Sequence, residues 1–191
     1  MKNIIITGGL GYIGTELCKI YSGYSWNDKI TVIDNRFVSE RVNQLRHWNM
    51  NFVQGDILDK ELIKRYCKDA DIVHHLAGIT DVPRVRSESS PDKDELINRV
   101  AKEGTQNILD VISDSCKIIM PSSHVVYEGL ETIKKNILEN EKTFPILSYG
   151  KSKDANENQL KASGKNYVIL RLGSVYGYST DTARIDIMAN F

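Results

Sequence analysis

Three side chains of this sequence, Ser123, Tyr149 and Lys153, have the types needed to move a proton on and off an alcohol. Tyr149 and Lys153 are four positions apart in a segment with a helical pattern, so they share one face of the expected helix. A phenol titrates near ~10 and is a poor base at neutral pH, but a neighbouring ammonium favours its phenolate form. Ser123 follows an apolar strand, and its hydroxyl can hydrogen-bond a substrate oxygen. The three groups predict acid–base chemistry of the kind that accompanies hydride transfer.

A tyrosine four residues before a lysine is also common on ordinary helix surfaces, so the pair needs support from elsewhere in the chain. A glycine-rich turn at residues 8–14 follows an apolar, β-branched run and precedes a helical pattern. A strand, a glycine turn and a helix in this order predict a site where backbone amides and the helix dipole hold a pyrophosphate. The candidate binding residues in this turn are Gly8, Gly11, Tyr12, Ile13 and Gly14.

An acidic residue stands where a dinucleotide site needs one. The second apolar run, residues 29–33, ends at Asp34, at the spacing of a carboxylate that binds the adenosine ribose hydroxyls. Such a carboxylate repels a ribose 2′-phosphate, which favours NAD over NADP as the cofactor. Arg36 works against this preference, because a nearby arginine can accept that phosphate. The alternative interpretation of the motif is an ordinary turn followed by a solvated aspartate.

The elements that must position these groups are strands alternating with helices. The predicted strands are residues 2–7, 29–33, 51–53, 70–76, 117–120 and 167–170, and helices are predicted at 58–68, 91–114 and about 149–162. Ser90 and Ser148 are the expected helix caps, and Gly164 is the expected stop. This alternation predicts an α/β fold, a Rossmann-type doubly wound parallel sheet with helices on both faces. Ligands of such sheets bind at the carboxyl ends of the strands.

Bulk properties narrow the class of protein. The 191 residues suffice for one domain, and the 41% hydrophobic and 26% charged contents are ordinary. A formal net charge of zero gives no electrostatic reason to bind nucleic acid or an anionic membrane, and no apolar run is long enough to span a bilayer. Without a signal-peptide layout, the protein is expected in the cytoplasm. Cys18, Cys67 and Cys116 suggest buried small side chains rather than disulfides, and no metal site is expected because His74 and His75 point to opposite faces of a strand.

At this point the chain resembles the extended short-chain dehydrogenases/reductases of the NAD-dependent epimerase/dehydratase family. The resembling motifs follow family order along nearly the whole chain: Thr7 to Gly14, Asp34-Asn35, Gly55-Asp56-Ile57, His75 to Gly78, Ser122-Ser123 with Val126-Tyr127, Tyr149 to Lys153, and Arg171-Leu172 leading to Val175-Tyr176-Gly177.

The resemblance implies a role for each matching position. Asp34 and Asn35 would bind the adenosine ribose, Asp56 and Ile57 would flank the adenine, and Leu76, Ala77 and Gly78 would line the cofactor. Ser123, Tyr149 and Lys153 would do the chemistry, with Tyr149 and Lys153 also contacting the cofactor. Substrate contacts are expected from Thr80, His124 and Ser174. The implied partners are a nucleotide-sugar substrate and a second copy of the chain, packed through the long helix and the Tyr149 helix.

Departures from the family pattern narrow the expected reaction. His124 and Val125 stand where the dehydratases carry an Asp-Glu pair and where decarboxylases place a glutamate at the second position. Valine cannot exchange protons, so both reactions are disfavoured. Epimerisation through a transient keto-sugar is the leading hypothesis. The alternatives are an NAD-dependent sugar dehydrogenase or reductase of the same family, and a non-catalytic dinucleotide-binding regulator.

Further departures concern the helices and the length. Ala101 replaces an asparagine that the family often carries, Ser174 replaces another after the sixth strand, and Glu128 interrupts the usual Val-Tyr-Gly. Family members also continue well past this length into a second, smaller domain. The expected organisation is therefore an NAD-binding domain with the catalytic residues at 1–178, and the start of a truncated substrate-binding region at 179–191.

Overall fold

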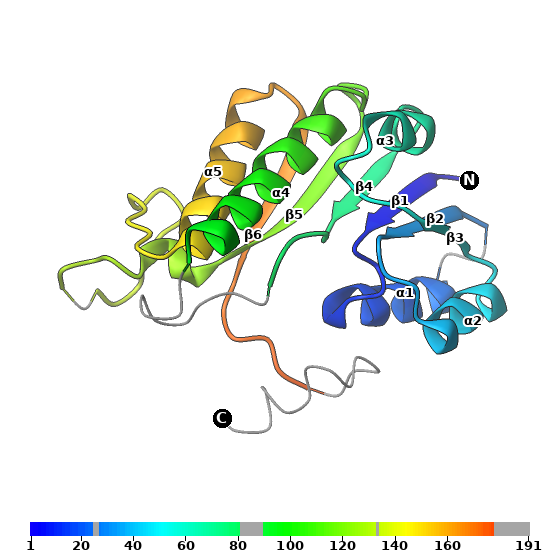
Figure 1. Cartoon of the computed structure of the whole chain (residues 1–191), viewed down its shortest axis with the longest axis horizontal. Helices are drawn as coiled ribbons and strands as arrows, with labels where there is room; N and C mark the ends of the chain where they lie inside the picture. Colours follow the sequence, from blue (N-terminus) through cyan, green and yellow to red (C-terminus); the bar gives the residue numbers. More distant parts are fainter. Residues whose placement is uncertain (25–26, 81–89, 133, 178–191) are drawn as a thin grey trace.

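The computed structural model describes residues 1–24, 27–80, 90–132 and 134–177. Its strands form a single parallel sheet in the order β3-β2-β1-β4-β5-β6 (Figure 1). The strands are β1 (Asn3–Thr7), β2 (Lys29–Asp34), β3 (Asn51–Gln54), β4 (Ile72–His75), β5 (Lys117–Ser123) and β6 (Asn166–Leu172). Because neighbouring strands run parallel, all their carboxyl ends meet at the same edge of the sheet.

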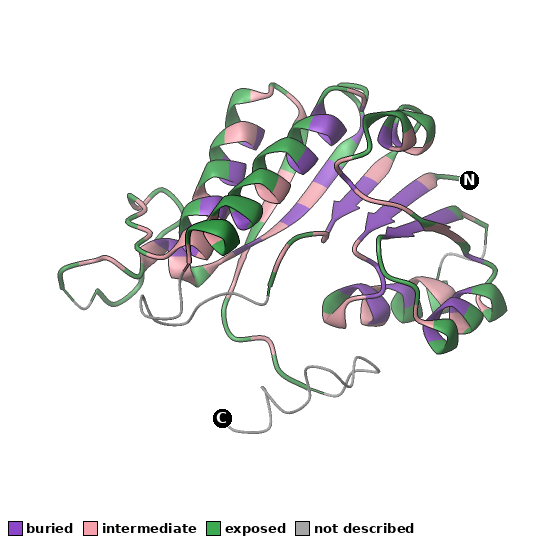
Figure 2. Cartoon of the chain, in the orientation of Figure 1, coloured by how far each residue is buried: buried purple, intermediate pink, exposed green. Residues whose placement is uncertain are grey.

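Helices cover both faces of this sheet, as the sequence predicts. The helices are α1 (Tyr12–Tyr24), α2 (Ser39–His47), α3 (Lys60–Cys67), α4 (Pro91–Leu109) and α5 (Ser148–Ala162). One core joins Ile4 and Ile6 of β1 to α1 and α2, and the other joins Ile5 to α3, α4 and α5. Alternate side chains of one buried strand therefore enter different cores. Figure 2 shows this burial along the strands and the inner faces of the helices.

The sheet reverses its direction of winding beside β1. β1 pairs with β2 on one side and with β4 on the other, so the chain crosses the sheet between β3 and β4. A ligand crevice opens at such a reversal, outside the carboxyl ends of the two strands. The turns after β1 and β4 meet here so closely that a Cβ on Gly8 would lie 2.6 Å from the Ala77 nitrogen.

The structure differs from the sequence prediction at the ends of two helices, and it contains one helix, α2, that the sequence does not predict. The helix predicted to run from residue 91 to 114 ends at Leu109. Its predicted last turn instead folds around Ser113, whose Oγ contacts Ser115 and accepts a hydrogen bond from the Cys116 backbone nitrogen. Such a local side-chain bond competes with the helical one. Helix α2 was not among the predicted helices.

The predicted cap Ser148 is also wrong, because Ser148 is already helical and Leu147 holds the capping position without a side-chain hydrogen bond. Ser90 does cap α4, its hydroxyl accepting from the Lys93 nitrogen, and Gly164 ends α5 in the left-handed conformation at φ +68°.

The cysteines and histidines behave as the sequence predicts. Cys18, Cys67 and Cys116 are buried free thiols, and burial raises the pKa of each, to about 12, 12 and 11. His74 and His75 face different cores. Within the described ranges, no cluster of His, Cys, Asp and Glu has the arrangement of a metal site, and no helix is long and apolar enough to cross a membrane.

Candidate active site

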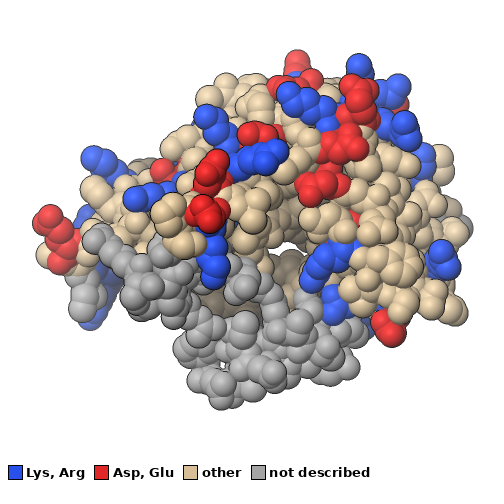
Figure 3. Space-filling view, viewed as in Figure 1, with Lys and Arg blue, Asp and Glu red and all other residues tan. Residues whose placement is uncertain are grey.

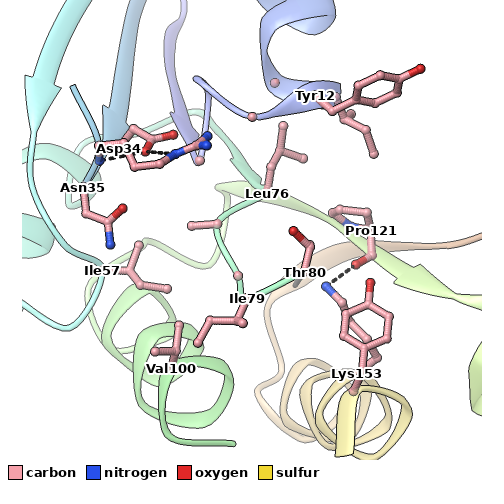
Figure 4. Close-up of a pocket in the computed structure, with 18 of the residues that line it drawn as sticks. Tyr12, Asp34, Asn35, Ile57, Leu76, Ile79, Thr80, Val100, Pro121 and Lys153 are labelled. Carbon is pink, nitrogen blue, oxygen red and sulfur yellow. Dashed lines mark hydrogen bonds and ion pairs between the residues drawn. The ribbon is translucent and has the colours of Figure 1, made fainter. Parts of the chain in front are cut away.

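A cavity of about 720 Å³ lies at the carboxyl edge of the sheet, beyond the ends of β1 and β4 (Figure 4). Of the eighteen predicted site residues, sixteen line it, from both halves of the fold. They are Gly8, Gly11, Tyr12, Ile13, Gly14, Asp34, Asn35, Asp56, Ile57, Leu76, Ala77, Gly78, Thr80, Ser123, Tyr149 and Lys153. The topology thus brings together groups that are up to 145 positions apart in the sequence.

The glycine turn brings its backbone close to this part of the cavity. Gly8 has φ +69°, a conformation that disfavours other residues. A Cβ at Gly14 would lie 2.5 Å from Gly9 Cα and 2.6 Å from the Gly8 oxygen, so α1 can begin only if residue 14 is glycine. The first turn of α1 consequently presents its N-terminal end to the cavity, which fits a pyrophosphate group.

Asp34 lies beside this turn and is almost fully buried, at 6% exposure. Its Oδ2 accepts a hydrogen bond of 3.0 Å from the Leu10 nitrogen, which fixes the glycine turn to the end of β2. Its Oδ1 accepts from the backbone nitrogen of Arg36 at 3.0 Å and from Arg36 Nε at 3.4 Å. The carboxylate is therefore placed where a ribose would bind, but a half-exposed guanidinium partly offsets its charge.

Asn35, Asp56 and Ile57 line another part of the cavity. Asn35 Nδ2 donates to Asp56 Oδ2 at 3.3 Å, and Ile57 is held by Asn107 Nδ2, which donates to the Ile57 oxygen at 3.0 Å. Gly104 lets Ile57 pack against α4, because a Cβ there would come within 2.3 Å of Ile57 Cδ1. This part of the cavity thus combines an apolar side chain with an amide and a carboxylate.

The three chemistry-bearing residues come from two adjacent elements. Ser123 ends β5 and caps the short 3₁₀ turn η2 (His124–Tyr127), its Oγ accepting from the Val125 nitrogen at 3.4 Å. Tyr149 and Lys153 lie on the first two turns of α5, and Lys153 Nζ is 5.7 Å from the centre of the Tyr149 ring. The two side chains thus lie side by side, as the four-residue spacing predicts.

Lys153 is held in place by the sheet. Its Nζ donates a hydrogen bond of 3.0 Å to the backbone oxygen of Pro121, two residues before Ser123 (Figure 4). Burial lowers the pKa of Lys153 to about 8. The amine therefore still carries a proton at neutral pH but holds it less tightly than a solvated lysine does.

Beneath Lys153, a buried hydrogen-bond network connects α5 to the end of β1. His75 Nδ1 is 3.0 Å from Thr7 Oγ1, its Nε2 is 3.0 Å from Thr105 Oγ1, and Asn156 Nδ2 donates to that same hydroxyl at 2.8 Å. Burial, and secondarily the charge of Lys153, lower the pKa of His75 to about 3. His75 is therefore a neutral structural link between the sheet, α4 and α5.

Replacing His75 by glutamine is expected to flatten the loss of stability in acid. Between pH 6.5 and about 3 the unfolded chain binds a proton at this position that the folded protein excludes, so the free energy of unfolding falls as the pH drops through this window. The contribution of one such group is about 1.4 kcal/mol per pH unit. Denaturant unfolding between pH 7 and 4.5 measures the slope.

The matched control for this experiment is His47→Gln, which changes an exposed histidine. We expect the His47 variant to keep the slope of the unchanged protein. Equal slopes for His75→Gln and the unchanged protein would contradict the assignment of His75 as a buried neutral link.

Two predicted substrate contacts, His124 and Ser174, are absent from the cavity lining. His124 is exposed, with Nδ1 3.3 Å from the Leu172 oxygen. Sequence reasoning missed several apolar lining residues, and nothing in their types distinguishes them from ordinary core or loop positions. They include Ile79, Leu96, Val100, Pro121, Leu172 and Val175.

Comparison with known proteins agrees with the family resemblance found in the sequence. The model of the NAD dependent epimerase/dehydratase family matches residues 4–190. CDP-paratose 2-epimerase of Salmonella typhi is 31% identical over 91% of this chain and 57% of its own length. UDP-N-acetylglucosamine 4-epimerase from Methanobrevibacter ruminantium M1, solved with UDP-N-acetylmuramic acid, superposes with a TM-score of 0.76 at 30% identity, over 94% of this chain and 57% of the other.

The Bordetella bronchiseptica enzyme WbmH, solved with NAD⁺, superposes with a TM-score of 0.75 at 27% identity, over 93% of this chain and 57% of its own. The chain thus spans somewhat more than half the length of these three relatives.

Proposed function

Because the chain belongs to the NAD dependent epimerase/dehydratase family, we propose that it forms the NAD-binding and catalytic part of an enzyme that epimerises a nucleotide sugar. The observation that carries this proposal is the shared cavity: Ser123, Tyr149 and Lys153 border the same space as the glycine turn and Asp34. We further propose that residues 1–178 form this part and that the sugar and nucleotide are selected mainly by residues beyond it.

The cavity has the features that a dinucleotide needs. The N-terminal end of α1 would hold the pyrophosphate, Asp34 and Asn35 the adenosine ribose, and Asp56 and Ile57 the adenine. Bound NAD would supply the acceptor and then the donor of the hydride. Arg36 pairs with Asp34 but does not remove its carboxylate. Because the negative charge of Asp34 opposes a ribose 2′-phosphate, the proposed cofactor is NAD and not NADP.

The residues of the chain would handle the proton. Tyr149 would take the hydroxyl proton of the sugar as the carbonyl forms, and would return it after the keto-sugar has turned over. Lys153, anchored on the Pro121 oxygen, would favour the phenolate and hold the nicotinamide ribose. Ser123 would hydrogen-bond the sugar oxygen from the end of β5.

Epimerisation is favoured over dehydration by the side chains next to Ser123. Elimination of water needs a second acid and base close to the sugar, yet η2 presents Val125, which has no proton to exchange, and His124, which lies outside the cavity lining. Thr80 lies in the lining and we propose it as a substrate contact, whereas Ser174 is proposed only at the outer rim.

Product analysis tests the proposal. The protein would be given NAD and a panel of UDP-, GDP-, CDP- and dTDP-sugars, and the products identified by mass spectrometry and NMR. We expect a sugar isomer of unchanged mass and no net formation of NADH. Loss of two hydrogens with accumulation of NADH would contradict epimerisation and establish a dehydrogenase. NAD binding without turnover of any sugar by the full-length protein would establish a binding role.

Two further features stay proposals. We propose a homodimer packed through α4 and α5, although the described outer face of these helices carries charged side chains such as Arg99 and Glu103, paired at 3.5 Å. On the face shown in Figure 3, acidic and basic side chains are interspersed, which agrees with the absence of an electrostatic reason for nucleic-acid binding. The cytoplasmic location also stays a prediction.

A further inference from the structure

The first turn of the catalytic helix has no cap of its own. Leu147 occupies the capping position of α5 and cannot accept a hydrogen bond through its side chain. Free amides at a helix start need an acceptor, and a side chain from elsewhere in the chain can supply it. An acceptor at this helix start bears on the site, because Tyr149 is the second residue of the helix.

Glu128, 18 positions before Ile146 in the sequence, binds the two residues that lead into this helix. Its Oε1 accepts hydrogen bonds of 2.6 Å from the backbone nitrogens of both Ile146 and Leu147. The two bonds are short, as expected for a carboxylate acceptor at a helix N-terminus. Glu128 is also the residue that interrupts the Val-Tyr-Gly pattern of the family, so this contact is a property of this chain rather than of the motif.

The contact joins the two elements that carry the catalytic groups. Glu128 directly follows η2, which begins beside Ser123, and its carboxylate reaches the residues just before Tyr149. The junction is tight: a Cβ on Gly150 would lie 3.1 Å from Glu128 Oε1 and 3.1 Å from the Val125 oxygen. Two backbone hydrogen bonds hold the ends of the same connection together. The Gly129 nitrogen donates to the Phe144 oxygen at 2.8 Å, and the Phe144 nitrogen donates to the Val126 oxygen at 2.7 Å.

We propose that Glu128 is a positioning residue, which sets the place of Tyr149 relative to Ser123 by anchoring Ile146 and Leu147, the entry to α5, at the end of η2. The inference rests on the proposed function, since it assigns Glu128 to the proton-transfer pair. Glu128 is not part of the cavity lining, so it acts through α5 and not on a ligand.

The test compares Glu128→Ala with Glu128→Gln, which keeps an acceptor oxygen at the same reach. Amide hydrogen exchange at Ile146 and Leu147 reports the two hydrogen bonds to Glu128. NMR of ¹³Cζ-labelled tyrosine reports the surroundings of Tyr149. Its signal is assigned as the one that disappears in Tyr149→Phe. We expect exchange about 10-fold or more faster in Glu128→Ala, together with a shifted Tyr149 signal and titration midpoint. Glu128→Gln should restore both to near the values of the unchanged protein.

Glu131→Ala is the matched control, because it removes an exposed glutamate from the same connection. Unchanged amide exchange in Glu128→Ala would overturn the proposal. Faster exchange with an unmoved Tyr149 signal would also overturn it, since Glu128 would then be only structural. These readouts need no substrate, so they are independent of the product analysis. On a substrate that is turned over, kcat should fall about 10-fold or more, while the Kd for NAD stays unchanged.

Discussion

Tyr149→Phe is expected to lower turnover of the proposed substrate by about 1,000-fold, the middle of the range for a positioned acid–base group. The phenylalanine ring keeps the shape that packs near Lys153 Nζ, 5.7 Å away, but it has no hydroxyl to take up or return a proton. NAD affinity should change little, because the glycine turn and Asp34 are untouched. Turnover is measured by product analysis, and the Kd for NAD by calorimetry.

Tyr167→Phe is the matched control, since it removes a hydroxyl from a tyrosine that lies on β6 and is 38% exposed. Wild-type turnover is expected for that variant. If Tyr149→Phe also kept its turnover, another residue would have to be the acid–base group, and the proposal for Tyr149 would fail. If it lost NAD binding as well, the effect would be on the cavity and not on proton transfer.

Glu157→Ala should produce the largest loss of stability. Glu157 is completely buried on α5, and its carboxylate accepts hydrogen bonds from Ser122 Oγ at 2.7 Å, Arg171 Nε at 2.8 Å, Arg171 Nη2 at 2.6 Å and Lys161 Nζ at 3.1 Å. Removing one partner of a buried pair leaves the other charge uncompensated, which costs about 3–5 kcal/mol. The melting temperature should fall by roughly 10 °C for a chain of this length.

The control for Glu157→Ala is Glu103→Ala, which breaks an exposed pair with Arg99 on α4. Exposed pairs contribute less than about 1 kcal/mol, so the melting temperature should hardly move. Similar losses in the two variants would contradict the assignment of Glu157 as the centre of a buried network that joins α5, β5 and β6.

The same network predicts an acid limit for stability. Burial alone would raise the pKa of Glu157, but the hydrogen bonds from Arg171, Ser122 and Lys161 and the charge of Arg171 outweigh it and lower the pKa to about 2. The stabilisation is complete above the ordinary value of 4.5 and is lost as the pH falls from 4.5 toward 2. The effect of His75 begins at pH 6.5 and that of Glu157 only below 4.5, so an unfolding series above pH 4.5 reports His75 alone, and the two effects add between 4.5 and about 3.

Much of the fold follows from local patterns that need no tertiary information. Apolar runs such as Ile4–Ile6 alternate with helical patterns, and only a parallel sheet covered on both faces buries them all. The glycine turn and Asp34 are equally predictable from the sequence, because the tight turn tolerates no side chain at Gly14, where a Cβ would meet the backbone of Gly8 and Gly9. The spacing of Tyr149 and Lys153 places both on one helix face, and the structure keeps them together.

The sequence-based prediction failed at two helix ends, the start of α5 and the end of α4. Ser148 is a sound cap by type, but Leu147 holds the capping position, and Glu128 from 18 positions before Ile146 binds the backbone nitrogens of Ile146 and Leu147. At the end of α4 the cause is local instead, because Ser113 Oγ accepts from the Cys116 nitrogen and turns the chain where helical spacing would continue it.

The sequence by itself determined the fold class and predicted the phosphate turn and the acid–base pair, because each depends on residue types at short spacing. The tertiary structure alone decided which distant groups share a cavity, that His124 lies outside its lining, and that Arg36 pairs with Asp34. It also decided the burial that lowers the pKa of Lys153 to about 8. Those properties arise from desolvation and contacts between elements, which no local pattern contains.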